Sequence, residues 1–378
     1  MKVGIVVPFS WSFWGAVVEH AELQAQALRD LGVETQTIMG NDPPGQFTRA
    51  LHPRVGRDGP PPPDVIPVGR SAIVPANASL PNIILGPRSV LRLRRVLEHE
   101  RFDLIHVHEP MTPVLAIGAL AMTRSPVVAT FHAAGELRWT KPGMPLWGFL
   151  LDRIDARIAV SERARETAER YAPADYEVIP NGVLIPPEAD PADREQRILF
   201  VGRQEARKGL PVLLRAWPDV HRRTGTRLRV IGADPLAVRL LIGRERISDE
   251  GIDSLGFLTQ EQLTEELLSA KALAAPSLGG ESFGMVLTRA FACATPVVAS
   301  DIEGYRDVMT PETGLTVSPG DRAALADALV ALLADEERRC RFGLAARRLA
   351  EEHYSWEDIG CRLLQVYERV LGRVPAAA

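Results

Sequence analysis

The sequence is poor in cysteine and contains no long apolar run. Its three cysteines, Cys293, Cys340 and Cys361, are odd in number and lack the spacing of metal ligands. We therefore expect reduced thiols, as in a cytoplasmic protein. No apolar stretch is long enough to cross a bilayer, and the first strand is expected to begin at Lys2, which leaves no room for a signal peptide. These absences disfavour a disulfide-stabilised secreted domain and a membrane-spanning chain.

A strong excess of charge of either sign is also missing. The formal net charge is −4, with 24% charged and 46% hydrophobic residues. Nucleic-acid-binding domains usually carry a basic excess, so the totals give no support for such a function. With 378 residues, the chain is longer than one hydrophobic core usually serves, and we expect two domains.

Short apolar runs alternate with longer helical patterns along the chain, which predicts parallel sheets covered by helices. In the first half, the expected strands are Lys2–Phe9, Gly32–Ile38, Asp103–His108 and Pro126–His132, and the expected helices are Ala16–Leu31 and Pro87–Glu100. In the second half, the expected strands are Arg197–Val201, Arg227–Ile231, Ala272–Ala275 and Pro296–Ala299.

This alternation predicts an α/β fold with two Rossmann-like, doubly wound domains that face a central cleft. The first domain would span residues 1–183 and the second 196–355, joined by a proline-containing linker at 184–195. A last helix, 356–371, is expected to pack back on the first domain. The segment 41–68, with Pro60–Pro63 and nearby Arg54, Arg57 and Arg70, is expected to be a surface loop or, alternatively, a lid near an acceptor.

Two cations follow the first strand of the second domain. Arg203 and Lys208 lie within Gly202–Gly209, directly after Val201. At the carboxyl end of a parallel strand they would face the cleft, where two cations can neutralise a departing diphosphate. An ordinary surface role is the alternative, and the position after a strand favours the diphosphate.

A glycine-rich turn, Gly279–Val286, lies between the strand Ala272–Ala275 and an apolar helix. Glycines let the backbone approach a ligand, and amides at a helix start favour an anion. Glu281 in this turn can accept hydrogen bonds from sugar hydroxyls, or it can cap the helix. Its combination with Arg203 and Lys208 favours the sugar.

Three residues of the first domain lie in or near the expected strands. Gly15 follows a strand and precedes a helix, where the backbone can approach a phosphate. His132 closes its strand and can reach the cleft, although a packed histidine is the usual alternative. His106 lies further back along its strand, so we interpret it as structural.

No Asp-x-Asp motif occurs in the chain. One major glycosyltransferase architecture uses that motif to hold a divalent cation against the diphosphate of the donor. Its absence predicts a site without a metal ion or other cofactor, in which Arg, Lys and helix amides hold the phosphates.

The sequence resembles glycosyltransferase family 4 nearly from end to end, and within it the phosphatidylinositol mannosyltransferases. Besides the two motifs, the resemblance rests on Pro8–Ser10, His106–Pro110, Ala129–His132 and Ile179–Val183. It implies a GT-B fold and metal-independent, retaining transfer of a hexose, with GDP-mannose as donor and a phosphatidylinositol-like lipid as acceptor. It also implies a same-face route, in which the departing phosphate oxygen takes the acceptor proton.

The resemblance assigns roles to individual residues. The catalytic residues would be His132, Glu281, Arg203 and Lys208, with His132 beside the reacting carbon, Glu281 on the sugar hydroxyls, and both cations on the diphosphate. The nucleotide sugar would contact Gly15, Arg203, Lys208, Glu281, Ser282, Phe283, Gly284, Met285, Val286 and Arg289.

Several positions depart from the family pattern. Arg289 stands where the family has a second glutamate for the ribose hydroxyls, and an arginine cannot accept their hydrogen bonds. Ala16 replaces the second of two glycines. Phe9 and Asn82 stand where the resembled enzymes have a hydroxyl and a basic residue for the inositol phosphate.

Arg88, Arg92 and Arg95 fall on one face of the helix Pro87–Glu100. In the resembled enzymes, a basic helix at this point meets anionic membrane lipid. The same pattern suits the solvated face of a packed helix. Three hypotheses therefore remain: a lipid acceptor at the inner face of the plasma membrane, a soluble acceptor, and a degenerate member that binds ligand or partner without turnover.

Overall fold

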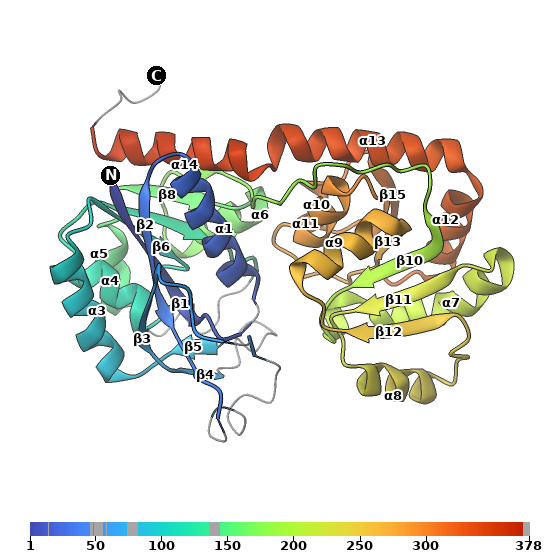
Figure 1. The fold of residues 1–378 in the computed structure, drawn as a ribbon, viewed down its shortest axis with the longest axis horizontal. Coiled ribbons are helices and arrows are strands. Elements are labelled where there is room, and N and C mark those ends of the chain that lie inside the picture. Colours follow the sequence, from blue (N-terminus) through green and yellow to red (C-terminus); the bar gives the residue numbers. More distant parts are fainter. Residues whose placement is uncertain are drawn as a thin grey trace. The chain divides into compact units, whose positions relative to one another are not determined.

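The chain folds into two compact units, one of Met1–Gly182 with Trp356–Ala378 and one of Val183–Ser355 (Figure 1). The computed structural model describes residues 1–13, 15–45, 48, 56–57, 59–73, 82–135 and 144–372, and only the backbone of 144–147. In these ranges, no helix is long and apolar enough to cross a membrane. Each unit is built on a mainly parallel sheet with helices between its strands, so the predicted doubly wound α/β class is confirmed.

The sheet of the first unit has the strand order β3-β2-β1-β6-β7-β8-β9, and all pairs along this path are parallel. Two short strands, β4 and β5, pair with each other in antiparallel fashion, and β5 also pairs with β1. The strands are β1 (Lys2–Ser10), β2 (Glu34–Gly40), β3 (Val65–Gly69), β4 (Ser71–Ile73), β5 (Asn82–Ile84), β6 (Leu104–His108), β7 (Val127–Phe131), β8 (Ala156–Ala159) and β9 (Glu177–Val178). The helices are α1 (Ala16–Asp30), α3 (Pro87–Glu100), α4 (Leu115–Met122), α5 (Met144–Leu151), α6 (Glu162–Tyr171) and α14 (Trp356–Val370).

The central strand β1 is buried along almost its whole length. Because side chains alternate between the two faces of a strand, Val3 and Ile5 join one apolar cluster, whereas Val6 joins another. The first cluster includes Leu28 of α1, and the second includes Leu93 of α3. Both faces of this sheet are therefore covered, which explains the nearly continuous apolar sequence of β1.

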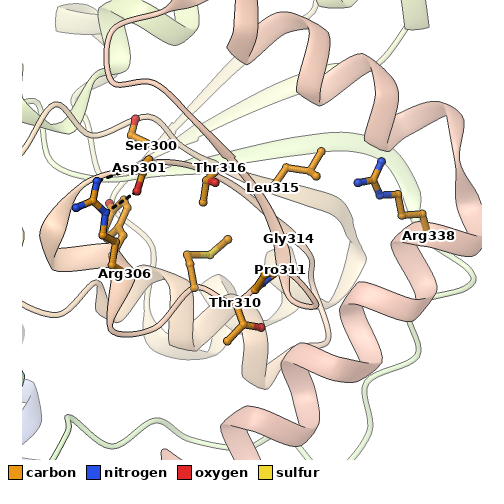
Figure 2. A pocket seen from close by; sticks show the side chains of 11 residues that line it. Ser300, Asp301, Arg306, Thr310, Pro311, Gly314, Leu315, Thr316 and Arg338 are labelled. Carbon is orange, nitrogen blue, oxygen red and sulfur yellow. Dashed lines mark hydrogen bonds and ion pairs between the residues drawn. The ribbon is translucent and has the colours of Figure 1, made fainter.

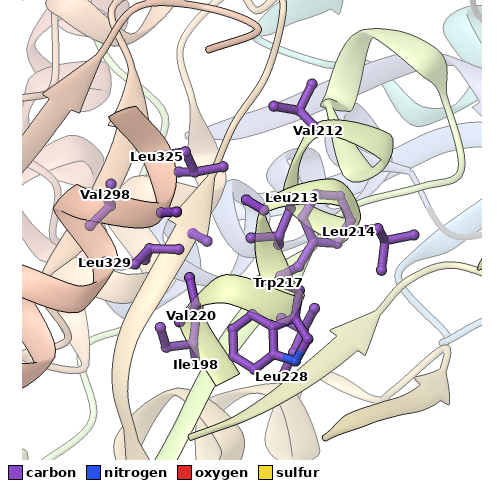
Figure 3. Close-up of a cluster of buried hydrophobic side chains, with 14 of the residues drawn as sticks. Ile198, Val212, Leu213, Leu214, Trp217, Val220, Leu228, Val298, Leu325 and Leu329 are labelled. Atoms are coloured by element: carbon purple, nitrogen blue, oxygen red, sulfur yellow. The ribbon is translucent and has the colours of Figure 1, made fainter. Parts of the chain in front are cut away.

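The second unit has the strand order β12-β11-β10-β13-β14-β15, again entirely parallel. Its strands are β10 (Glu195–Val201), β11 (Arg227–Ile231), β12 (Ile252–Gly256), β13 (Ala270–Ala275), β14 (Val297–Ser300) and β15 (Gly314–Val317). Its helices are the 3-10 turn η2 (Ala206–Lys208), α7 (Leu210–Thr224), α8 (Pro235–Glu245), α9 (Gln260–Ser269), α10 (Met285–Ala292), α11 (Glu303–Arg306), α12 (Arg322–Ala334) and α13 (Glu336–His353). In its core, the fully buried Trp217 of α7 belongs to the same cluster as Ile198 of β10 and Leu228 of β11 (Figure 3).

Strands β2 and β3 differ from the sequence-based expectation. β2 begins at Glu34 and not at Gly32, because Gly32 adopts φ +81° and closes the turn after α1. β3 begins inside the segment 41–68, which was expected to be a loop, and contains Pro67. A proline lacks the N–H of a ladder hydrogen bond, and β3 tolerates it because it is an edge strand. Arg54 and most of residues 46–58 lie outside the described residues, so the lid hypothesis stays a prediction.

Helix α14 belongs to the first unit and packs there on α1 (Figure 1). Gly360 of α14 lies against Ala27 of α1, where an added Cβ would be 3.2 Å from the Ala27 Cβ. Gly182 lies against Trp356, and an added Cβ there would come within 2.5 Å of the indole. Glycine at these two positions allows the last helix to approach the rest of its unit closely.

Candidate functional site

The two motif loops of the second unit meet because their strands are neighbours. β10 pairs with β13 in parallel, with Leu199 opposite Leu273, so the loops that follow both strands lie at the same edge of the sheet. Gly209 has φ +73°, and an added Cβ would lie 1.8 Å from the carbonyl oxygen of Pro276. The N–H of Leu278 donates to the carbonyl of Arg207 at 2.7 Å. Only glycine at position 209 permits this contact between the loops.

A network of charged side chains connects these loops. Lys208 Nζ lies 2.8 Å from Glu281 Oε1, and Arg207 Nη1 lies 2.9 Å from the same oxygen. Arg207 also pairs with Glu205 at 2.8 Å, and Glu205 pairs with Arg203 at 3.0 Å. The Glu281 side chain is only 9% exposed, whereas that of Arg203 is 42% exposed. A buried carboxylate needs such partners, because an unpaired buried charge is costly.

The backbone of Glu281 is fixed from its other side by α11. An added Cβ on Gly304 would lie 2.0 Å from the carbonyl oxygen of Glu281, so α11 and the loop are in direct contact. Tyr305, next in sequence, is buried, and its hydroxyl is 2.8 Å from Ser277 Oγ. Ser277 in turn donates to Glu281 Oε1 at 3.3 Å. The position of the Glu281 carboxylate is therefore determined by both loops and by α11.

Helix α10 begins directly after this turn. Gly284 precedes its first residue, Met285, with φ +85°, and the first-turn amides of a helix have no partners within the helix. Phe283 is buried and packs edge-to-face on Tyr354, so only its backbone is available to a ligand. Ser282, Met285 and Val286 are partly exposed.

Arg289 lies one turn further along α10 and is partly exposed. Its charge is one of those that act on Cys293 at the end of the same helix. Burial nevertheless raises the pKa of the Cys293 thiol to about 12. Helix α10 therefore carries a cation at the position where the resembled family has a carboxylate.

In the first unit, two histidines end neighbouring strands. β6 and β7 are parallel, with His108 opposite Thr130, so His108 and His132 lie at the same edge of the sheet. His108 Nδ1 is 2.9 Å from His132 Nε2. Glu109 adopts φ +49°, an unusual conformation for glutamate, and its Oε1 accepts the backbone N–H of His132 at 2.9 Å. Burial raises the pKa of Glu109 to about 7.

A third histidine, His20 of α1, completes a buried group with His108 and His132. The ring centroids are 5.0 Å apart for His20–His132, 5.5 Å for His20–His108 and 5.2 Å for His108–His132. Burial lowers the pKa of His20 to about 4 and holds those of His108 and His132 well below the ordinary value. All three imidazoles are therefore neutral at pH 7.

His106 is buried, in agreement with its interpretation as structural. Its Nδ1 lies 2.6 Å from the Tyr367 hydroxyl of α14, and its Nε2 lies 2.7 Å from Thr130 Oγ1. Gln24 of α1 lies within hydrogen-bond distance of both His106 and Tyr367. His106 also stacks on His108 at 4.7 Å, so α1 and α14 both support the histidine group.

Gly15 directly precedes α1 and has an extended backbone with φ −166°, which any residue can adopt. No described atom lies within 4 Å of a Cβ added at this position. Neither backbone conformation nor packing among the described residues therefore requires glycine here. This leaves the open space in front of α1 as a position for a ligand.

Two features of the first unit bear on an acceptor. Phe9 of β1 pairs with Ile83 of β5, which places Phe9 beside Asn82. On α3, Arg88, Arg92 and Arg95 are exposed, and only Ser89 and Leu93 of that helix are buried. Two leucines are exposed with the arginines, Leu91 of α3 (61%) and Leu85 just before it (41%).

A separate hollow of about 500 Å³ lies in the second unit beside β14 and β15 (Figure 2). Asp301 and Arg306 form an ion pair at its wall, and Arg338 of α13 lies across from them. Tyr305 lines this hollow and also supports Ser277. Tyr305 therefore belongs both to the wall of the hollow and to the contacts that support Glu281.

Sequence reasoning missed Arg207, Ser277 and Tyr305 in the second unit and His20 and His108 in the first. One signal for His20 was available, because it lies on the buried face of α1, where an apolar residue is expected. Arg207 is a third cation in the segment Gly202–Gly209, but the sequence does not show which of the three cations forms an ion pair with Glu281.

Comparisons with known proteins agree on one class. Residues 17–184 match the family described as Glycosyltransferase Family 4, and residues 195–335 match Glycosyl transferases group 1. The chain is 34% identical to a phosphatidyl-myo-inositol mannosyltransferase of Mycobacterium leprae, over 98% of this chain and 97% of that protein. It is 30% identical to a D-inositol 3-phosphate glycosyltransferase of Xylanimonas cellulosilytica, over 76% of each chain.

The fold also resembles solved structures. The pneumococcal O-GlcNAc transferase GtfA, solved with UDP and GlcNAc, has a TM-score of 0.73 at 12% identity, over 98% of this chain and 99% of that one. At this identity the similarity concerns the fold alone, which is GT-B.

Proposed function

The chain belongs to glycosyltransferase family 4, and from this premise we propose that it transfers mannose from GDP-mannose to a phosphatidylinositol-like lipid with retention of configuration. The observation that carries the proposal is the pairing of Lys208 and Arg207 with Glu281, in a chain that is 34% identical to a phosphatidyl-myo-inositol mannosyltransferase along nearly its whole length.

The donor would bind the second unit by exchanging ion pairs. Without a ligand, Glu281 neutralises Lys208, so a diphosphate can draw the lysine toward itself. Arg207, bound to Glu281 at 2.9 Å and to the Gly280 carbonyl at 3.0 Å, then keeps the carboxylate in place. Glu281 would accept hydrogen bonds from the sugar, while Lys208 and Arg203 stabilise the charge on the leaving diphosphate.

The proposed role of His132 agrees with its protonation state. A same-face transfer passes through an oxocarbenium-like centre, which carries positive charge, so a protonated imidazole beside it would oppose the reaction. Burial keeps the pKa of His132 well below its ordinary value, so the ring is neutral. A neutral His132 can contact the donor sugar beside the reacting carbon, and the departing phosphate oxygen takes the acceptor proton.

The acceptor would be presented at a membrane surface. The exposed Arg88, Arg92 and Arg95 with Leu91 form a surface that combines positive charge and apolar area, which suits anionic lipid headgroups. A soluble inositol phosphate is the second candidate, because the chain is also similar to a D-inositol 3-phosphate glycosyltransferase.

The donor is tested first, by thermal unfolding with GDP, UDP, ADP and their sugars, with and without Mg²⁺. A ligand at 100 times its dissociation constant stabilises the folded state by about 2.7 kcal/mol, which raises Tm by about 5 °C or more for a unit of this size. We expect this shift with GDP and GDP-mannose, without dependence on Mg²⁺, and its loss in Arg203→Ala. Arg223→Ala, which removes an exposed cation elsewhere in the same unit, serves as the control.

The acceptor is tested with labelled GDP-mannose and either phosphatidylinositol liposomes or soluble inositol phosphate. Label in the lipid phase supports the lipid acceptor, and label only in the aqueous product supports the soluble one. Replacement of Arg88, Arg92 and Arg95 by glutamate should abolish co-sedimentation with anionic liposomes. Nucleotide binding without transfer to either acceptor would refute the proposal and favour a degenerate member.

A further inference from the structure

The buried histidine group of the first unit has the dimensions of a metal site. In a tetrahedral site with three histidines and metal–nitrogen bonds of about 2.0–2.1 Å, ligand nitrogens lie about 3.3 Å apart and the ring centroids about 5 Å apart. The centroids of His20, His108 and His132 are 5.0, 5.2 and 5.5 Å apart. One nitrogen of each ring lies within 4.8 Å of the others. The three side chains form a nearly equilateral triangle, as three imidazoles around one ion do.

The hydrogen bonding of these rings leaves nitrogen atoms unpaired. His108 Nε2 and His20 Nδ1 are buried and have no hydrogen-bond partner among the described residues. A buried polar atom without a partner destabilises the fold, and metal coordination is one way to satisfy a nitrogen lone pair. His108 Nδ1 already lies 2.9 Å from His132 Nε2, so the unpaired Nε2 is the nitrogen that His108 would offer to an ion.

The surroundings would hold the rings in place for a ligand. Metal-bound histidines are typically oriented by neighbouring groups that contact the remaining ring atoms or the backbone. Here the backbone of His132 is held by Glu109, and the His108 ring is stacked on His106. His132 is 8% exposed, which leaves the group a point of contact with solvent.

We propose that His20, His108 and His132 together bind one divalent transition-metal ion of the zinc class, with water in the fourth position. Imidazole ligands suit Zn²⁺, Co²⁺, Ni²⁺ and Cu²⁺ and disfavour Mg²⁺ and Ca²⁺. No sequence motif indicates such a site, because the ligands come from three separate elements: α1, the end of β6 and the residue after β7.

Occupancy of this site would inhibit the enzyme. If His132 contacts the donor sugar, as proposed above, a metal ion on its ring withdraws it from that role and adds positive charge beside the reacting carbon. This consequence depends on the proposed function, whereas the binding of the ion does not. Metal binding and inhibition are therefore measured separately.

Binding is measured on tag-free protein, stripped of metal with EDTA and then desalted. Titration with Co²⁺ should produce visible ligand-field absorption that saturates at one ion per chain and disappears on addition of Zn²⁺. His20→Gln, His108→Gln and His132→Gln should each weaken binding by at least about tenfold. The double variant His99→Gln and His353→Gln, which removes histidines outside the group, should bind as the unchanged protein does.

X-ray absorption of the zinc-loaded, unsubstituted protein tests the ligands without any variant, because three imidazoles give a characteristic scattering pattern. Absence of stoichiometric binding, or a first shell with fewer than three imidazoles, overturns the proposal even if the variants fold poorly. Transfer activity should fall with bound Zn²⁺ and return with a chelator. Binding without inhibition would preserve the metal site and contradict the proposed role of His132.

Discussion

Replacement of Gly304 by alanine tests whether the position of Glu281 determines activity. The substitution removes no functional group and leaves all charges unchanged. The new Cβ would lie 2.0 Å from the carbonyl oxygen of Glu281 and 2.6 Å from its carbonyl carbon. Real Cβ atoms essentially never come closer than 3.0 Å to another heavy atom, so one backbone must move by about 1 Å.

The loop, and not α11, is expected to move. Tyr305 anchors α11, because its side chain is buried and its hydroxyl is bonded to Ser277. A displacement of about 1 Å at a group that positions substrate can cost about 100-fold in rate, or about 2.7 kcal/mol of transition-state stabilisation. The strain should lower the free energy of unfolding by about 1–3 kcal/mol.

The assay compares kcat/KM for sugar transfer and donor affinity between Gly304→Ala and Gly243→Ala. Gly243 lies in α8 with nothing within 4 Å of an added Cβ, so alanine there should stabilise the helix by about 0.5–1 kcal/mol and leave transfer unchanged. If folded Gly304→Ala retained both donor affinity and kcat/KM within about twofold, the reasoning that a fixed Glu281 is required would be refuted.

Three further substitutions separate function from stability. Gly15→Ala should change the free energy of unfolding by less than about 1 kcal/mol, because the new Cβ meets open space. The same substitution should raise the KM for the donor at least about tenfold, and an unchanged KM would exclude a ligand in front of α1. The pKa of Glu109 is raised to about 7 from an ordinary 4.5, so the folded protein binds the proton more tightly and loses stability as pH rises from about 5 to 8. Glu109→Gln should remove about 1–3 kcal/mol of this pH-dependent change in the free energy of unfolding. The free energies of unfolding of the variant and the original protein should therefore differ less at pH 5 than at pH 8. Arg194→Met should lower the free energy of unfolding of the second unit in urea by about 4 kcal/mol or more, because the guanidinium donates to the buried carbonyls of Leu267 and Cys293. A loss below about 1 kcal/mol would contradict the inferred contribution of these hydrogen bonds.

Edge strands were the elements that sequence patterns described least well. β12 reads Ile-Asp-Ser-Leu-Gly and is mostly half-buried, because it lies at the edge of its sheet, and it was not predicted. The interior strands β1, β6, β7, β10 and β13 are buried on both faces and gave the continuous apolar runs from which they were predicted. A strand buried on both faces requires a run of apolar residues, which is visible in the sequence. A strand at the edge of a sheet needs no such run.

The doubly wound α/β class could be predicted from the sequence alone, and so could the placement of Arg203, Lys208, Glu281 and His132 in or next to the loops after strands. Both predictions were possible because strand alternation and motif spacing are local properties of the chain. The side chains that contact these residues depend on which strands become neighbours and on which unit each helix packs against. Tyr367 reaches His106 across 261 positions of sequence. Such contacts arise only when the core packs.

The same limit applies to the group of His20, His108 and His132. Each histidine lies in a different element, and periodicity predicts which face of an element is buried but not which side chain meets it there. The contact of Gly304 with Glu281 likewise depends on the approach of α11 to the Glu281 loop, which no sequence spacing encodes. Tertiary packing alone brought these residues together, because close packing relates side chains by distance in space and not by distance along the chain.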